Sequence, residues 1–261
     1  MNYTATLPFT PKQEIFEIYT PQQISSLNLN HIPKHIAIIP DGNRRWAKKR
    51  FFLPELGHNA GAEIVTNVVN ACRVLGVNAL TIYTFSTENW QRPKAEVAML
   101  MVLLKKYLTS QRESMIQKGI RLNTIGDLSP FSSDIKQIIQ DTKDATAAGN
   151  KIDLILALNY GGRDEIRRAV HSIIDDYGNN KIRKEEITEA MIGKHLDTAN
   201  WKDPDLLIRT SGEQRISNFL LWQLSYTEIF TTSVLWPEFT PHHLLEAILS
   251  YQKRERRLGG A

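Results

Sequence analysis

The stretch HIAIIPDGNRRWAKK, residues 35–49, joins a short β-branched run to a turn and then to a helix-compatible segment. Four more apolar runs follow along the chain: NALTIYTF (78–85), IRLNTIG (120–126), IDLILALN (152–159) and DLLIRT (205–210). Because apolar residues fill consecutive positions, these runs predict strands that are covered on both faces.

Segments with helical spacing lie between the runs. One apolar stripe follows Gly57 and ends at Gly76. A second begins at Pro93 and ends at Gly119, and further helices are predicted at about 131–148, 163–177 and 241–257. Strands that alternate with helices favour one α/β domain with a mainly parallel sheet. Residues 1–33 contain four prolines and predict a poorly structured, loosely attached arm.

The composition of the 261 residues is that of an ordinary soluble globular protein, with 42% hydrophobic and 23% charged residues. A net charge of +4 suits an anionic small molecule at least as well as nucleic acid. Cys72 is the single cysteine, which excludes an intramolecular disulfide and makes a reducing cytoplasm the expected compartment. No window approaches the roughly 18 apolar residues that span a bilayer, and the N-terminal stretch lacks a signal-peptide pattern.

Ligands bind at the carboxyl ends of parallel strands, so chemistry is expected in the loops that follow the runs. In the first loop, Gly42 lets the backbone approach a ligand, and Arg44 and Arg45 can donate to phosphate oxygens. Asp41 would repel phosphate unless Mg²⁺ lies between them. The alternative is an Asp-Gly-Asn turn that caps a helix beside two solvated arginines, and the two interpretations are about equally supported.

Two other loops have a similar composition. TFSTENWQRP (84–93) places small polar residues beside a tryptophan and an arginine, and IRTSGEQRISNFLLWQ (208–223) places two arginines near Ser211-Gly212. Helix capping, a core tryptophan and surface arginines explain each loop about as well when it is taken alone. Three such loops together favour two phosphate sites that converge on one metal.

The sequence resembles the cis-prenyltransferases, most closely the bacterial undecaprenyl diphosphate synthases. Six blocks in order from about residue 34 to 260 show this resemblance: HIAIIPDGNRRWA, GHNAGA, TIYTFSTENWQRP, ALNYGGRDEI, DLLIRTSGEQRISNFLLWQ and RERRLGG. The resemblance implies one catalytic domain over residues 34–261, with a mostly parallel six-stranded sheet, flanking helices and an apolar product tunnel. It also implies Mg²⁺-assisted condensation of isopentenyl diphosphate onto an allylic diphosphate, with farnesyl diphosphate as the expected primer. The implied product is a cis-polyprenyl diphosphate, the precursor of the undecaprenyl carrier lipid for cell-wall glycans.

The resemblance also implies roles by position. Asp41 corresponds to the catalytic aspartate that holds Mg²⁺, Asn89 to the proton acceptor and Glu228 to a further metal-associated carboxylate. An amide is a poor base, so Asn89 alternatively positions a diphosphate oxygen or a water that takes the proton. Substrate binding is implied for Gly42, Asn43, Arg44, Arg45, Trp46, His58, Ser86, Thr87, Glu88, Trp90, Arg92, Arg209, Arg215, Ile216 and Ser217.

The implied assembly is a homodimer in which the C-terminal Arg257-Leu258-Gly259 reaches the neighbouring subunit's site. The expected location is the cytoplasm, with peripheral contact at the inner membrane surface when product is released. Candidate tunnel walls are Val97, Leu100, Met101, Leu104 and Ile82, and ordinary core packing explains the same stripe equally well.

Three positions depart from the family's pattern. Pro54 stands where many relatives carry an arginine, so one phosphate contact is missing or comes from Arg50. Arg44 stands where bacterial relatives carry a glycine, which requires that its φ be negative. Gln214 stands where a histidine is common, which weakens the metal site implied at Glu228.

Two other classes of protein fit the sequence less well. A non-catalytic accessory subunit of the same fold tends to lose the aspartate loop, which is intact here. A nucleic-acid-binding or nucleotide-binding module would show a basic stripe or a Walker-type glycine–lysine loop, and the sequence contains neither. The sequence therefore favours an enzyme that acts on diphosphates and has no nucleic-acid partner.

Overall fold

A six-stranded sheet forms the centre of the computed structural model, which describes residues 11–254. The strands are β1 (His35–Ile39), β2 (Ala79–Ser86), β3 (Ile120–Ile125), β4 (Ile152–Tyr160), β5 (Leu206–Arg209) and β6 (Glu228–Thr231). Their order is β3-β4-β2-β1-β5-β6, and every neighbouring pair is parallel. The predicted parallel sheet is confirmed, and β6 at its edge is the strand that no apolar run predicts.

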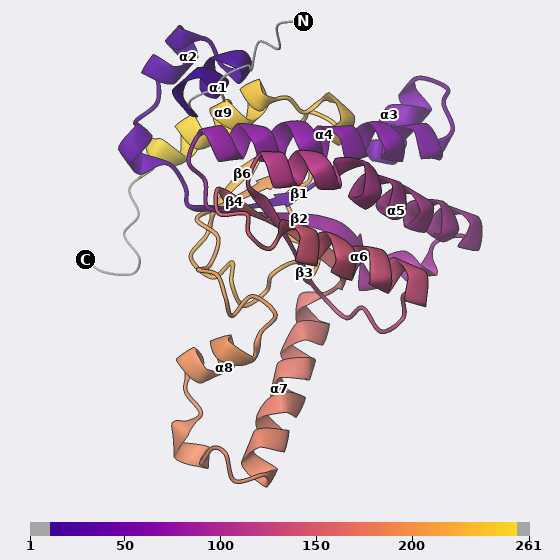
Figure 1. The fold of residues 1–261 in the computed structure, drawn as a ribbon, viewed down its shortest axis with the longest axis vertical. Coiled ribbons are helices and arrows are strands. Elements are labelled where there is room, and N and C mark those ends of the chain that lie inside the picture. The colour runs from indigo at the N-terminus through magenta and orange to yellow at the C-terminus, as the bar shows by residue number, and fades with distance from the viewer. Residues whose placement is uncertain (1–10, 255–261) are drawn as a thin grey trace, which may run out of the picture.

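Helices at the predicted segments connect β1 through β5 in succession, a loop connects β5 to β6, and α9 follows β6 (Figure 1). The predicted helices are α4 (Pro54–Val74), α5 (Lys94–Gln117), α6 (Ser133–Thr146), α7 (Gly162–Gly178) and α9 (Pro241–Gln252). Shorter elements are α1 (Pro11–Ile18), α2 (Pro21–Ser25), α3 (Asn43–Lys49), α8 (Glu189–His195), and the 3-10 helices η1 (Leu29–His31), η2 (Thr87–Gln91), η3 (Lys184–Glu186) and η4 (Trp236–Glu238). Within residues 11–254, no helix combines the length and apolar character that crossing a membrane requires.

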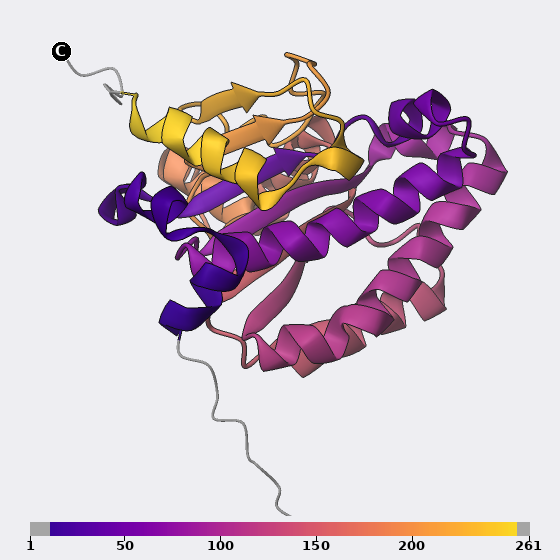
Figure 2. The same cartoon turned by 90° about the horizontal axis from the view of Figure 1, so that it is seen from above.

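Both faces of the sheet are covered by apolar side chains. Ile36 and Ile38 of β1 join a large core with residues of α4, α5, α6 and α9, and Figure 2 shows α4 and α5 running along that side. Ala37 and Ile39 face a smaller core, which Phe219 from the segment after β5 helps to close. Because both faces are filled, polar groups that bind a ligand are left to the ends of the strands.

The chain before β1 is part of the folded body from residue 11 onward. Tyr19, Leu27 and Ile32 are buried in the large core. This differs from the predicted poorly structured arm because Pro11 and Pro21 begin α1 and α2, where a proline costs no hydrogen bond, and do not interrupt regular structure.

We expect Tyr19→Ala to lower the free energy of unfolding by about 3–5 kcal/mol, since Tyr19 is 2% exposed in the large core. Phe16→Ala, at a side chain that is 55% exposed on α1, serves as the control and should change it by less than about 0.5 kcal/mol. Urea denaturation followed by circular dichroism measures both. Equal, small effects would show that this segment is only loosely attached.

Candidate active site

One cleft at the carboxyl ends of β1, β2 and β5 gathers half of the predicted site residues. Its volume is about 540 Å³, and its predicted lining residues are Asp41, Asn43, His58, Ser86, Glu88, Asn89, Arg92, Arg209 and Ser217. The parallel register explains this grouping, because Ile39 at the end of β1 lies beside Arg209 at the end of β5. Residues far apart in sequence therefore leave the sheet at one edge.

Asp41 and Arg209 form an ion pair in the cleft. Nη2 of Arg209 donates to Oδ2 of Asp41 at 2.9 Å, and Arg209 is only 4% exposed. Nη1 of the same guanidinium donates to the Ser217 hydroxyl at 2.8 Å and to the Arg215 carbonyl. The backbone N–H of Asp41 donates to the Thr210 hydroxyl at 2.8 Å. These contacts fix a carboxylate and a guanidinium side by side at the junction of two strands.

Arg45 and Arg215 share the carboxylate of Glu213. Arg45 lies 3.1 Å from Glu213 and 3.4 Å from Asp41, and it also donates to the hydroxyl and carbonyl oxygens of Ser211. Arg215 pairs with Glu213 and is otherwise open to solvent. These two guanidiniums are therefore held by carboxylates that an anionic ligand can displace.

Gly42 allows the loop after β1 to turn tightly against its neighbours. Its φ is +107°, a region that residues with a side chain rarely adopt, and a Cβ there would lie 2.9 Å from Leu235 Cδ2 and 3.1 Å from Ser211 Cβ. Arg44 follows within α3 and does not have a positive φ, so the condition set by its departure from the family is met.

The loop after β2 is held by its own polar side chains. Oδ1 of Asn89 accepts from the backbone N–H of Ser86 at 3.2 Å, which closes η2 as a capping box. Glu88 accepts from Nδ2 of Asn218 at 2.9 Å. Burial alone would raise the pKa of Glu88, but hydrogen bonds from Asn218 and the loop lower it overall, so this carboxylate is ionised.

Glu96 is a site residue that the sequence motifs did not indicate. Oε1 of Glu96 accepts from Arg92 at 3.2 Å and lies 3.5 Å from Nε2 of His58 and 4.0 Å from Nε of Arg44. Burial and the charge of Arg92 lower the pKa of His58, so this imidazole is neutral at neutral pH. The spacing of Arg92 and Glu96, four residues apart at the start of α5, is the sequence signal that identifies this pair.

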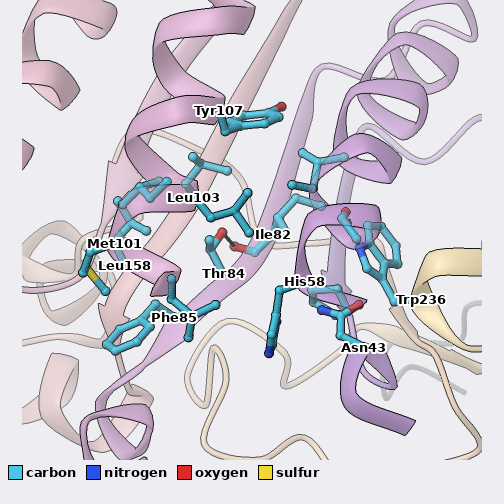
Figure 3. Close-up of a pocket in the computed structure, with 17 residues that line it drawn as sticks. Asn43, His58, Ile82, Thr84, Phe85, Met101, Leu103, Tyr107, Leu158 and Trp236 are labelled. Atoms are coloured by element: carbon cyan, nitrogen blue, oxygen red, sulfur yellow. Dashed lines mark hydrogen bonds between the residues drawn. The ribbon is translucent and has the colours of Figure 1, made fainter. Parts of the chain in front are cut away.

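An apolar cavity adjoins the polar cleft. Its volume is about 100 Å³, and Asn43 and His58 line both spaces. Figure 3 shows these two side chains at one end of the cavity and Tyr107 at the other, with apolar residues between them. Of the five candidate tunnel residues, Leu100, Met101, Leu104 and Ile82 line the cavity, and Val97 packs against the large core instead.

Some predicted substrate residues lie outside the cleft. Nε1 of Trp90 donates to Asn159 at 2.8 Å, and the indole packs edge-on against Phe85, so Trp90 anchors its loop. Trp46 packs against Phe52 in the connection between α3 and α4. Ile216 packs against the smaller core, and Thr87 begins η2 next to Gly161. Gly42, Arg44, Arg45 and Arg215 are also not among the residues that line the cleft.

Within one chain, Glu228 and Asp41, the two carboxylates implied for metal binding, lie at opposite ends of the strands. Glu228 begins β6 and lies level with Leu206 at the start of β5, which is the amino edge, and Asp41 is at the carboxyl edge. The Glu228 carboxylate instead pairs with Arg254 at 2.5 Å. The sequence order of two carboxylates does not reveal at which end of a strand each one lies. The predicted Arg257-Leu258-Gly259 contact falls outside the described residues.

The family departures have structural consequences of their own. Pro54 begins α4 and provides no donor. Arg50, which could have replaced the missing arginine, instead lies 4.4 Å above the Trp46 ring and pairs with Glu238 at 2.6 Å. Gln214 lies in the loop after β5. In the free protein the Arg50 guanidinium is therefore held by Trp46 and Glu238.

Comparison with known proteins identifies the family. Residues 39–259 match the family model described as "Putative undecaprenyl diphosphate synthase". The chain belongs to the undecaprenyl diphosphate synthase family. Relatives called isoprenyl transferase include those of Clostridium perfringens, 48% identical over 88% of this chain and 90% of that protein, and of Chlamydia trachomatis, 47% identical over 88% and 92%. The resemblance given by the six sequence blocks is confirmed.

Solved structures share this fold. Lavandulyl diphosphate synthase from Lavandula x intermedia, in complex with dimethylallyl diphosphate, has a TM-score of 0.85 and 37% identity over 87% of this chain and 98% of its own. A probable undecaprenyl diphosphate synthase from Campylobacter jejuni has a TM-score of 0.73 and 32% identity over the same shares. The chain is therefore a prenyltransferase by family.

The donor set of this prenyltransferase fits a metal that its substrate helps to hold. Within residues 11–254, no group of three His, Cys, Asp or Glu side chains is arranged to bind a metal ion. Mg²⁺ is commonly bound through one or two carboxylates together with substrate phosphates and waters. Asp41 is partly exposed and lines the cleft, so it can provide the protein carboxylate of such a site.

We expect Gly42→Ala to lower the free energy of unfolding of this prenyltransferase by about 2–4 kcal/mol, from backbone strain and the contact with Leu235. Gly212→Ala is the matched control, since Gly212 also has a positive φ, +77°, but a Cβ there would meet no neighbouring side chain or backbone within 4 Å. Gly212→Ala should lower the free energy of unfolding by about 1 kcal/mol. Urea denaturation measures the difference. Equal costs would show that the close approach at Gly42 has no energetic weight.

Proposed function

We propose that this prenyltransferase condenses isopentenyl diphosphate units onto an allylic diphosphate, with farnesyl diphosphate as the primer and cis geometry in the new double bonds. The product is a long-chain polyprenyl diphosphate, and its role is to supply the undecaprenyl carrier lipid for cell-wall glycans. The names of the relatives and the diphosphate complex of the lavender enzyme support this class of substrate.

The observation that carries the proposal is the continuity of the polar cleft with the apolar cavity. Asn43 and His58 line both, so a molecule with a charged head and a hydrocarbon tail finds matching surroundings in adjoining spaces. A nucleotide or a sugar phosphate would place polar groups against Ile82, Leu100 and Leu104, where no compensating hydrogen bonds are offered. An isoprenoid diphosphate has no such conflict.

The arginines bind the diphosphates by exchanging partners. In the free protein, Arg45 pairs with Glu213 and Asp41, and Arg209 pairs with Asp41. An incoming diphosphate provides several negatively charged oxygens, so it competes for these guanidiniums. Arg209 keeps its bonds to the Ser217 hydroxyl and the Arg215 carbonyl, which hold the guanidinium in place for the exchange. Fixed donors stabilise the leaving diphosphate most strongly when its charge is fully developed.

Asp41 would hold the magnesium ion through its carboxylate, together with oxygens of the bound diphosphate. When bound, Mg²⁺ supplies Lewis-acid stabilisation to the departing diphosphate. The exchange described for the arginines releases the carboxylate oxygens of Asp41 for this task, because Arg209 and Arg45 occupy them in the free protein. Release of these two arginines would therefore leave the Asp41 carboxylate available to a metal.

Asn89 positions the group that takes the proton from the isopentenyl carbon. Its Oδ1 is already engaged by the Ser86 N–H, so its Nδ2 amide is the atom left to hold a diphosphate oxygen or a water in the cleft. A neutral amide is a weak base, and a diphosphate oxygen is a better proton acceptor.

The working form is a homodimer in the cytoplasm, with Arg257-Leu258-Gly259 directed to the neighbouring site. The face of α7 supports an association of this kind, since Val170, Ile174 and Tyr177 are exposed at helical spacing on an element that stands away from the sheet in Figure 1.

Asp41→Asn keeps the side-chain shape and removes the charge, so we expect it to lower Mg²⁺-dependent incorporation of isopentenyl diphosphate into lipid by roughly 10²–10³-fold. The measurement is transfer of labelled isopentenyl diphosphate to an organic-soluble product with farnesyl diphosphate as primer. Asp41→Ala should lose at least as much activity.

Asp141→Asn on α6 is the control for the chemical change, because Asp141 is outside the cleft and accepts a hydrogen bond from Gln137 on its own helix. Circular dichroism and urea denaturation establish that each variant is folded. Normal turnover in a folded Asp41→Asn protein would contradict the role assigned to this carboxylate.

A further inference from the structure

The connection between α3 and α4 exposes consecutive apolar side chains to water. Phe51 is 99% exposed and Leu53 is 71% exposed, with Phe52 between them partly exposed as well. Single exposed apolar residues are common on protein surfaces, but adjacent large ones at a loop tip mark an interaction site. We call residues 51–53 the apolar tip.

The backbone at Phe51 has a conformation that is unfavourable for a residue with a side chain. Its φ is +57°, the left-handed region, at the position after a helix where glycine is most often found. The N–H groups of Phe51 and Phe52 donate to the carbonyls of Lys48 and Ala47, so the turn is closed by regular C-terminal hydrogen bonds. Glycine or asparagine would adopt this positive φ with less backbone strain. The Phe51 ring is exposed to water, so it contributes no packing energy to the folded state.

The base of the apolar tip is fixed by contacts to the rest of the protein. Phe52 packs against Trp46 with ring centroids 6.0 Å apart, and Arg50 lies 4.4 Å above the same ring. Arg50 also pairs with Glu238 at 2.6 Å, and Pro54 begins α4 directly after the tip. Phe51 and Leu53 are therefore presented by a defined turn.

Positive charge directly precedes the apolar tip, and the first acidic residue after it is Glu55 in α4. Lys48 and Lys49 precede it and are exposed, and neither forms a hydrogen bond or ion pair through its side chain within residues 11–254. No acidic residue occurs between Gly42 and Pro54. An anionic bilayer offers phosphates at the level of such lysines and acyl chains below them, which is the complement of this arrangement.

The apolar tip also lies next to the candidate active site. Pro54 begins α4, and His58, one helical turn later, lines both the cleft and the apolar cavity. In Figure 1 the α3–α4 connection is at the periphery of the molecule.

We propose that residues 48–53 dock the protein on an anionic lipid surface, with Phe51 and Leu53 inserted among the acyl chains and Lys48 and Lys49 at the headgroup phosphates. If the function proposed above holds, this docking brings the cavity that contains the hydrocarbon product close to the membrane that receives it. A lipid surface fits better than a second copy of the chain, since a two-fold contact at this tip would set Lys48 and Lys49 against their own copies.

The test measures sedimentation of the full-length protein with vesicles, in the absence of substrates. The vesicles consist of phosphatidylcholine alone or of equal parts phosphatidylcholine and phosphatidylglycerol. We expect wild-type protein to bind the anionic vesicles and Phe51→Gly/Leu53→Ser to bind them at least roughly tenfold more weakly. Lys48→Ala/Lys49→Ala should lose roughly fivefold per lysine on anionic vesicles only.

Glycine suits the φ of residue 51, so the apolar-tip variant keeps its fold, and its elongation rate in detergent should equal that of the wild type. Phe16→Ser/Tyr226→Ser, at exposed aromatic side chains elsewhere, and Lys184→Ala/Lys194→Ala are the matched controls and should bind vesicles normally.

Vesicle binding by the apolar-tip variant equal to that of the wild type would overturn the proposal, as would a wild-type protein that does not bind anionic vesicles. A concentration-dependent oligomer that is lost in the variant, without vesicle binding, would assign the tip to a second copy instead. Because no substrate is present, failure of the proposed activity leaves this result unchanged.

Discussion

The guanidinium of Arg209 is buried at the carboxyl end of β5 and requires an anionic partner, because an unpaired charge in the protein interior is very costly. Asp41 provides that partner from the end of β1, the neighbouring strand in the sheet. This ion pair constrains the loops that follow β1 and β5. The turn at Gly42, the hydroxyls of Thr210 and Ser217 and the loop after β5 are arranged so that the two charged groups meet at one edge.

The same edge is where a polar cleft meets an apolar cavity. The two faces of the sheet are filled by apolar cores, and the apolar cavity beside the cleft is lined mainly by residues of α4 and α5. Under the proposed function, a bound diphosphate would replace the Asp41 carboxylate as the anionic partner of Arg209. In that proposal, the opening of the Asp41–Arg209 ion pair makes both groups available to metal and substrate.

Much of the fold follows from the sequence because five apolar runs and five helical stripes are each long enough to be unambiguous. The segment of residues 11–31 is harder, since its prolines have opposite effects at the start of a helix and inside one. The cleft was predictable from the loops after β1, β2 and β5, and Glu96 was detectable only through its spacing from Arg92. The position of Glu228 was not predictable from order along the chain, because strand register decides which end of the sheet it occupies.

The central claim is that the cleft and the cavity together bind an isoprenoid diphosphate and extend it. The most direct measurement is to incubate the purified protein with Mg²⁺, farnesyl diphosphate and labelled isopentenyl diphosphate, and to size the products by chromatography. We predict products longer than the primer by whole isoprene units, with cis double bonds in the added part. A folded protein that elongates no allylic primer would contradict this activity.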